Sequence, residues 1–451
     1  MLEGSILKNL VTNHQKANQP INLGVYYKNT LVALCHALED FILESSGAPL
    51  MITAFQQGKW YLQEAERYGE IAHKACQIAI MATPGSGFAE HPTSQKENVA
   101  LVSLAGDDPV AEEWHLIILS PSYAAMVLCQ ELSPEDYGSQ GQPAEDLERK
   151  FYGFWTFEPE LVRETVELAI AHIGNYNQDL QSQLATQIQE ILTESGSSQR
   201  DDLGLVVGKV VTYLQNSQTN LSDQVSAGNA SSGSQALDEN LVSNKMQAFL
   251  RLAQLIDQAD VNNTMAASQV AALAEAMGQF LDLPAWQIKR LRLSSLLHRL
   301  APSLVKAVSG QDSQAVCSHV SNVEALRLMP RLKAIAHIIT HQTECWDGSG
   351  KPEGLAYDAI PLESRIIGLL AYFQERRSAY EKHTGNNPLA QALDDCQTES
   401  GQTFDPKLVE ALSLLVMGMQ QGMNIQAIQP KIATGMWLLD DYHGQVVSNK
   451  Q

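Results

Sequence analysis

The chain has 451 residues, of which 44% are hydrophobic, 18% are charged and six are cysteines. This length and composition predict two or three globular domains with sizeable cores. No apolar run approaches the roughly 20 residues that span a bilayer, and residues 1–16 lack the apolar core of a signal peptide. We therefore expect a cytoplasmic protein without membrane insertion. The cysteines form no Cys-x-x-Cys pair, which argues against zinc ribbons and disulfide frameworks.

The net charge of −21 is unevenly distributed. Residues 1–178 contain 10 Lys and Arg against 23 Asp and Glu, residues 179–240 contain 2 against 8, and residues 241–451 contain 18 against 20. The negative field of the first region repels nucleic acid and anionic lipid, so we expect no nucleic-acid partner. The last region is close to neutral and tolerates an anionic nucleotide in a local basic pocket.

Residues 1–178 alternate between helical and strand patterns. Apolar residues recur at helical spacing from Leu31 to Ile42, and short β-rich runs are bounded by turn residues. In chain order, the predicted elements are a helix over 31–42, a strand over 49–55, a helix over 68–79, strands over 99–104 and 114–119, and a helix over 159–173 that begins at a proline. This mixture predicts an α/β module around a central sheet.

Several motifs in this region resemble the DICT domain, a bacterial sensory module that accompanies cyclic-di-GMP enzymes and two-component proteins. The resemblance covers roughly residues 24–173 and includes Leu38-Glu39-Asp40, Arg67-Tyr68, Glu113-Trp114 and, most specifically, Phe151-Tyr152-Gly153-Phe154-Trp155-Thr156-Phe157-Glu158-Pro159. It implies a sensory role for residues 1–178. The aromatic side chains either cap a ligand pocket, with Trp114, Trp155 and Phe157 as candidates, or fill the core, as aromatics at such spacing more often do.

Residues 179–240 are expected to connect two domains. Two helix-like pieces, 180–193 and 203–214, form either a pair of packing helices or a dimerising stalk. The stretch 216–235, NSQTNLSDQVSAGNASSGSQ, is polar and has no hydrophobic period. Because it cannot bury enough apolar surface to offset the entropy of ordering, we expect it to be a flexible linker.

Residues 241–420 have the pattern of an all-α domain. Apolar stripes at helical spacing cover 246–256, 266–281, 284–297, 332–339, 366–375 and 406–417. They predict a helical bundle, so the whole chain is expected to be an α+β multidomain protein. Residues 421–451 are expected to form a C-terminal tail, in which 435–442 has the pattern of the start of a β-segment.

Residues 342–352 resemble the second signature of the HD-GYP phosphodiesterases, which are metal-dependent hydrolases of cyclic di-GMP with an HD-type helical bundle. That family has His-His-Glu, two residues, Asp-Gly, one residue and Gly-Tyr-Pro. This chain has Gln342-Thr343-Glu344-Cys345-Trp346-Asp347-Gly348-Ser349-Gly350-Lys351-Pro352. The residues that shape the loop are kept, but Gln342 and Thr343 replace the two histidines and Lys351 replaces the tyrosine.

The first signature of that family, Leu-Leu-His-Asp-Ile-Gly-Lys, is matched by residues 296–302, LLHRLAP. His298 is kept, but Arg299 replaces the metal-bridging aspartate, and its permanent positive charge opposes a cation. Phosphodiesterases of this kind need several His and carboxylate ligands to hold the ions that activate water, and loss of most ligands abolishes the site. The residues left over, which we interpret as a vestigial metal site, are His298, His337, His341 and Asp347.

These residues leave alternatives open. His337 and His341 are four apart on one helix face, so they either bind a single metal ion or form a structural pair. Asp347 also fits a hydrogen bond within its own turn. Three basic residues, Arg292, Arg299 and Lys351, are candidates for binding an anionic ligand. Arg299 either holds a phosphate bidentately or pairs with a nearby carboxylate.

Together these patterns predict a non-enzymatic bacterial signalling regulator. A DICT-like sensory domain is coupled to a degenerate HD-GYP-like domain, a pseudoenzyme that contacts signalling proteins as a monomer or homodimer. We expect no catalytic residue and no cofactor. Two alternatives remain: an effector that binds a cyclic dinucleotide through Arg299 and Lys351 without cleaving it, and a residual phosphohydrolase that uses His298, His337, His341 and Asp347 on one metal ion.

Overall fold

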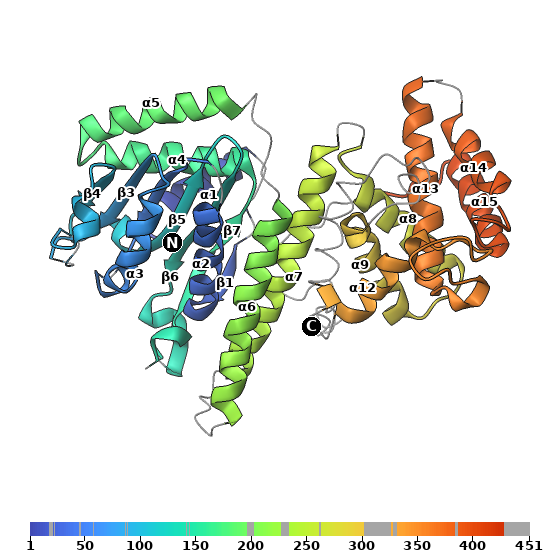
Figure 1. The fold of residues 1–451 in the computed structure, drawn as a ribbon, viewed down its shortest axis with the longest axis horizontal. Helices are drawn as coiled ribbons and strands as arrows, with labels where there is room; N and C mark the ends of the chain where they lie inside the picture. Colours follow the sequence, from blue (N-terminus) through green and yellow to red (C-terminus); the bar gives the residue numbers. More distant parts are fainter. Residues whose placement is uncertain are drawn as a thin grey trace, which may run out of the picture. The chain divides into compact units, whose positions relative to one another are not determined.

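The structure is a computed structural model that describes residues 1–17, 21, 23–44, 47–56, 58–85, 87, 89–140, 142–143, 145–195, 203–226, 234–260, 263–301, 326–327, 332–383 and 387–427. The chain divides into two compact units, which we call unit 1, Met1–Ala248, and unit 2, which begins at Phe249 (Figure 1). The expected fold class is confirmed, because unit 1 contains a sheet with helices and unit 2 is helical.

A seven-stranded sheet forms the centre of unit 1, with strand order β1-β7-β6-β5-β2-β3-β4. The three strands β2, β3 and β4 are parallel to one another, and the other neighbours are antiparallel. The strand bounds are β1 Gly24–Tyr27, β2 Leu50–Ala54, β3 Gln77–Ala82, β4 Val99–Ser103, β5 Glu113–Leu119, β6 Ala124–Glu131 and β7 Lys150–Thr156.

Helices cover both faces of this sheet. The helices α1 (Ile6–Lys16), α4 (Pro159–Ile173) and α5 (Gln178–Ser195) share one hydrophobic core with one face. The helices α2 (Lys28–Glu44) and α3 (Gly58–Ile71) lie against the other face, where the ring of Trp60 from α3 is 5.7 Å from that of Trp114 in β5. Because both faces are covered, the inner strands β2 and β3 are buried along their whole length.

The predicted helix over 68–79 is wrong in its second half. Helix α3 ends at Ile71, and the strand β3 begins at Gln77. A strand buried on both faces is a continuous apolar run, which periodicity alone does not distinguish from a buried helix. Strand pairing stabilises the extended conformation here, since β3 is hydrogen-bonded to β2 on one side and β4 on the other.

The segment expected as connector and linker is largely helical. Helix α5 belongs to the core of unit 1 through Leu180, Leu184, Ile188 and Ile191. Helix α6 (Leu203–Ser226) packs against α2, and α7 (Ser234–Ala259) follows it (Figure 1). Most of the stretch 216–235 is therefore helical, because the helices extend beyond their apolar stripes, and residues 227–233 lie outside the described residues.

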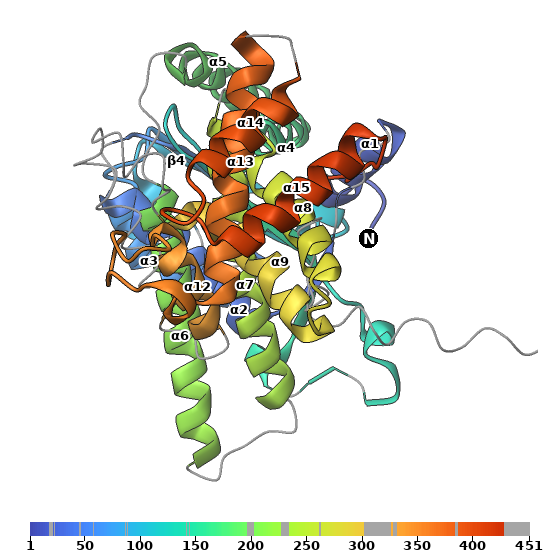
Figure 2. The ribbon, with the colours of Figure 1, turned by 90° about the vertical axis from the view of Figure 1, so that its right-hand side faces the viewer.

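Unit 2 is a bundle of helices, and Figure 2 looks onto it. Helix α13 packs against α8, α9, α12, α14 and α15, and its Ile366, Leu370 and Phe373 are fully buried. The bounds are α8 Ala266–Phe280, α9 Ala285–Leu297, η5 His298–Leu300, α12 Lys333–Thr340, η7 His341–Thr343, η8 Tyr357–Ala359, α13 Leu362–His383, α14 Pro388–Thr398 and α15 Pro406–Gln420. The expected β-segment over 435–442 lies outside the described residues.

The ranges given above contain helices of up to 26 residues. None of the helices there combines the length and the hydrophobicity that a bilayer span requires.

Candidate functional site

The loop after η7 keeps a tight shape that depends on its glycines. A Cβ atom on Gly350 would lie 2.2 Å from the backbone nitrogen of Cys345, a distance that no side chain tolerates. Gly348 has a φ of +85°, in the left-handed region that favours glycine. Glu344 holds the far side of the loop, since its Oε1 accepts from the Glu353 amide at 2.7 Å and its Oε2 from the Leu355 amide at 3.2 Å.

Asp347 lies on the surface of this loop and bonds within its own turn. Its Oδ1 accepts from the Ser349 amide at 2.9 Å and from the Ser349 hydroxyl at 2.6 Å. The bond from the Ser349 hydroxyl, with that from the Ser349 amide, lowers the pKa of Asp347. The structure therefore has the turn arrangement expected as the alternative to metal binding.

His298 is buried at the start of η5, directly after α9. Its Nδ1 lies 2.6 Å from the Ser295 carbonyl oxygen, and burial lowers the pKa of His298 to about 4. The ring is therefore neutral at neutral pH, with Nδ1–H as the donor. Gln342, where the family has a histidine, donates its Nε2 to the His298 carbonyl oxygen at 2.8 Å and joins the two signature segments by a neutral hydrogen bond.

Arg299 is clamped by two carboxylates from the end of α7 and the turn after it. Its Nη1 lies 2.8 Å from Asp257 Oδ1, and its Nη2 lies 2.8 Å from Asp260 Oδ2. The Asp257 side chain is only 4% exposed, and its other oxygen accepts from the Ala267 amide at 2.9 Å. Burial raises the pKa of Asp257, while the Arg299 charge opposes that rise. The guanidinium thus has carboxylate partners, the second of the two arrangements expected for it.

The structure brings His337 and His341 together. Their ring centroids are 4.2 Å apart, and His341 Nδ1 lies 2.7 Å from the His337 carbonyl oxygen. The buried Nε2 of His341 lies 3.3 Å from Glu353 Oε1 without hydrogen-bond geometry. His337 is exposed, and partial burial and the neighbouring His341 lower its pKa. The carboxylate of Asp347, the fourth candidate, accepts from Ser349 in its own turn.

The described side chains at the two signatures are bonded to other groups of the protein. A guanidinium held by two carboxylates stands at the bridging position, and both oxygens of Glu344 bind loop amides. Within the described ranges, no three His, Cys, Asp or Glu side chains are grouped so that they could hold an ion. The chemistry of paired ions needs such a group, because each ion requires several His or carboxylate ligands.

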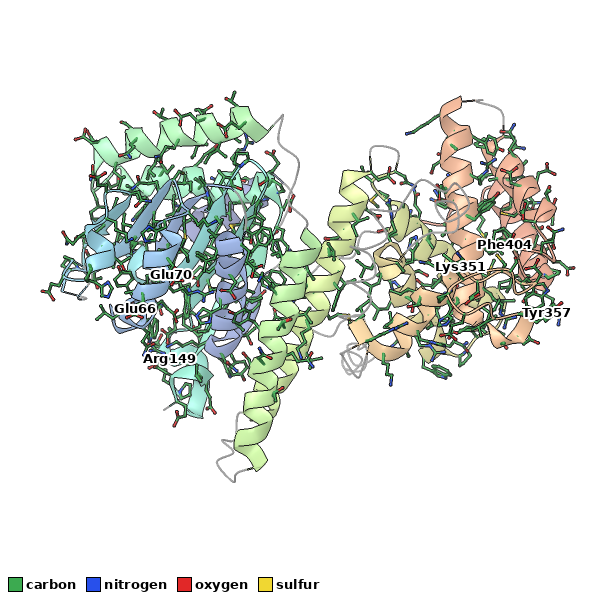
Figure 3. The ribbon with its side chains drawn as sticks, viewed as in Figure 1. Glu66, Glu70, Arg149, Lys351, Tyr357 and Phe404 are labelled. Carbon is green, nitrogen blue, oxygen red and sulfur yellow. The ribbon has the colours of Figure 1, made fainter. Side chains whose placement is uncertain are left out.

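The other two basic candidates lie apart from Arg299. Arg292 Nε is 3.7 Å from Glu275 Oε2, and both side chains are about one third exposed, at 35% and 37%. Lys351 is exposed on the loop (Figure 3), and its backbone oxygen accepts from the Thr343 hydroxyl at 2.7 Å. The structure therefore leaves Lys351 as the exposed cation of the second signature.

The aromatic candidates of unit 1 belong to its core. Trp155 in β7 is fully buried and lies edge-to-face with Phe157, at a centroid distance of 5.6 Å. Trp114 is 9% exposed and is packed between Trp60 and Phe151. These contacts match the core-filling alternative of the sequence analysis. The indole Nε1 of Trp155 donates to Asn244 Oδ1 in α7 at 2.9 Å, a contact that the sequence did not predict.

Sequence reasoning also missed a buried ionic network in unit 1. Arg67 in α3 donates through Nε to Glu39 Oε2 at 2.6 Å and pairs with Asp40. Asp40 in turn accepts from the Tyr213 hydroxyl of α6. The signal was present, because Leu38-Glu39-Asp40 and Arg67-Tyr68 are among the motifs of the DICT resemblance, and charged residues in such motifs need partners when buried.

A small pocket in unit 2 was missed as well. It is lined in part by Trp346, Arg365, Phe404 and Asp405. Arg365 Nη1 lies 2.9 Å from both Asp358 Oδ1 and Asp405 Oδ2, and its guanidinium carbon is 5.4 Å from the Trp346 ring centroid. The ion pair joins segments that are about 40 residues apart in the chain, since Arg365 lies in the first turn of α13 and Asp405 precedes α15.

Comparison with known families assigns the main regions. Residues 4–132 match the DICT model, described as a sensory domain in diguanylate cyclases and two-component systems. Residues 145–223 match CHASE6_C, the C-terminal domain of a two-partite extracellular sensor domain, and residues 237–408 match an HD domain model, HD_5. The fold and these matches define a protein with a sensory domain and an HD-type domain. In particular, the chain contains a DICT sensory domain and an HD-type domain homologous to HD-GYP phosphodiesterases.

The curated relatives are cyclic-dinucleotide phosphodiesterases. The chain is 38% identical over 84 residues to the 3'3'-cGAMP-specific phosphodiesterase 3 of Vibrio cholerae, which is 19% of this chain and 17% of the relative. It is 25% identical over 183 residues to the cyclic di-GMP phosphodiesterase response regulator RpfG of Xanthomonas campestris, which is 37% of this chain and 47% of the relative. The chain therefore spans less than half the length of these relatives.

A solved structure with detectable likeness is that of a cyclic GMP-AMP specific phosphodiesterase of Vibrio cholerae, V-cGAP3. The match has a TM-score of 0.29 and 22% identity, and it covers 39% of this chain and 49% of the other.

Proposed function

We propose that this chain is a bacterial signalling regulator in which the DICT sensory domain controls an HD-type domain that does not hydrolyse phosphodiesters. The observation that carries the proposal is the Arg299 clamp, because the position that bridges two metal ions in the resembled family holds a cation bound to Asp257 and Asp260. A positive charge fixed at that position opposes binding of a divalent ion.

The neighbouring positions support the same proposal. Gln342 uses its amide to bind the His298 carbonyl oxygen, and Glu344 uses both oxygens to bind the loop. Neither arrangement offers the open coordination position that a catalytic ion needs for its water. We therefore expect the HD-type domain to contact signalling proteins and not to cleave a nucleotide.

Elemental analysis and turnover test this proposal on one sample of the purified full chain. After incubation with Fe²⁺ or Mn²⁺ and desalting, we expect no stoichiometric metal and no hydrolysis of cyclic di-GMP or 3'3'-cGAMP. Two tightly bound ions per chain, together with hydrolysis, would overturn it. The matched control is the variant Arg299→Asp with Gln342→His and Thr343→His, which restores the family's residue types at three positions.

A second candidate is an effector that binds a cyclic dinucleotide without cleaving it. Two observations favour it: the relatives are named for cyclic di-GMP and 3'3'-cGAMP, and Lys351 is exposed on the signature loop. Calorimetry with both nucleotides tests it, with Lys351→Ala and Arg299→Ala as variants. Because Arg299 already has two carboxylate partners, Lys351→Ala should weaken binding more. No binding by the wild type at high micromolar nucleotide rejects this candidate.

The third candidate, a residual phosphohydrolase on one metal ion, is favoured only by the His337–His341 pair with its buried Nε2. A manganese-supplemented assay on the wild type and on His298→Ala tests it, and activity that survives the substitution refutes the role assigned to His298.

The cytoplasmic location, the protein partners, the homodimer and the domain boundaries at residues 178 and 240 remain predictions.

A further inference from the structure

Helix α7 is shared by the two units. It runs without interruption from Ser234 to Ala259, and the division between the units falls after Ala248, within the helix. Its first part therefore packs with unit 1 and its second part with unit 2. A continuous α-helix resists bending, because beyond its first turn each backbone amide is bonded to a carbonyl one turn earlier.

The first part of α7 is attached to the DICT sheet. Asn244 is fully buried, and its Oδ1 accepts from the indole Nε1 of Trp155 at 2.9 Å. Trp155 lies in β7, where it pairs with Val127 of β6. Both partners are buried, so loss of this bond would leave a polar group with a desolvation cost. A side-chain hydrogen bond therefore joins β7 directly to α7.

The second part of α7 is attached to η5 of unit 2, which contains His298 and Arg299 of the first signature. Asp257 binds Arg299 through one oxygen and the Ala267 amide at the start of α8 through the other. Arg299 follows His298 in the short helix η5 that ends α9. The buried carboxylate thus joins α7 to two further helices of the HD-type domain, and a buried ion pair is costly to separate.

We propose that α7 transmits the state of the DICT sheet to the HD-type domain through these two attachments, Trp155–Asn244 and Asp257–Arg299. Trp155 and Arg299, both named in the sequence analysis as candidate ligand contacts, hold the same helix. This inference rests on the proposed signalling role of the chain. It is independent of whether the HD-type domain binds metal or nucleotide.

Hydrogen–deuterium exchange of the full chain tests this transmission without any ligand. The variant Trp155→Phe removes the indole donor, and we expect exchange to rise about five-fold, as for loss of one buried neutral hydrogen bond, in peptides covering 249–260 and 263–268. The matched control is Trp114→Phe, the same substitution at another buried position of the same sheet, which should leave those peptides unchanged.

The reverse direction provides a second measurement. Coupling between two sites is reciprocal, so Asp257→Asn in unit 2 should raise exchange in β7 of unit 1. A rise confined to residues 241–248 in Trp155→Phe, or no change in β7 in Asp257→Asn, would overturn the proposal. If Trp155→Phe unfolds unit 1, Asn244→Ala removes the same bond from the helix side and is judged by the same peptides.

These outcomes are separate from those of the proposed function. Metal binding or hydrolysis would overturn the non-hydrolytic role and leave the exchange result standing. Absence of transmitted exchange would overturn the role of α7 and leave the metal analysis standing.

Discussion

Replacement of Arg299 by alanine gives the sharpest test of how its ion pairs work. The substitution leaves Asp257, whose side chain is 4% exposed, as a buried carboxylate without its cation. Breaking a buried pair in this way costs about 3–5 kcal/mol. Because Arg299 is 20% exposed and Asp260 is 25% exposed, water screens part of the interaction, and we expect about 3 kcal/mol.

Arg292→Ala is the matched control. Arg292 and Glu275 are more than one third exposed on average and 3.7 Å apart, so the loss should be about 0.5 kcal/mol or less. The assay is peptide-resolved hydrogen exchange in increasing urea, which reports unit 2 separately from unit 1. Adding Asp257→Asn to Arg299→Ala should recover part of the stability, since the uncompensated charge is removed.

The comparison of the two variants decides the matter. Equal small losses in Arg299→Ala and Arg292→Ala would refute the reasoning, because they would mean that the clamp contributes no more than a surface pair. In that case the Arg299 guanidinium would be available to an anionic ligand, and the cyclic-dinucleotide candidate would gain support.

Two further predictions concern His298 and the signature loop. Burial holds the folded pKa of His298 at about 4, below the 6.5 of an ordinary histidine, so unit 2 should lose stability as the pH falls from 6.5 through 4. His298→Gln should flatten that part of a urea–pH profile, and a wild-type profile that is already flat there contradicts the prediction. Gly350→Ala should destabilise the loop by about 2 kcal/mol or more, since its Cβ would lie 2.2 Å from the Cys345 nitrogen. Gly106→Ala, where the Cβ meets open space, is the thermal-melting control, and equal midpoints for both variants would refute the packing argument.

Helices with clear ends could be predicted closely. The helix expected over 159–173 is α4, Pro159–Ile173, because a proline in the first turn marks its start and an apolar stripe marks its buried face. The strand β7 could not be predicted, although its aromatic residues were singled out. Its pairing with β6 and β1 depends on residues far away in the chain, and a local pattern does not contain that information.

The candidate site also has features that the sequence could predict and features that it could not. The sequence alone showed that Arg299 stands where the resembled family has an aspartate. It could not show what binds Arg299, since Asp257 and Asp260 are 42 and 39 residues away in the chain. The turn of Asp347, in contrast, is local, and its bond within that turn was one of the two alternatives that the sequence left open.

The side chain of Glu344 holds the two ends of the signature loop together. Its two oxygens accept from the amides of Glu353 and Leu355. Glu344 is therefore required for the fold of the loop whether or not a reaction takes place there. An acidic residue at position 344 and glycines at positions 348 and 350 therefore indicate only that the loop folds. Evidence about chemistry has to come from positions 299, 342 and 343, where the side chains differ from those of the resembled family.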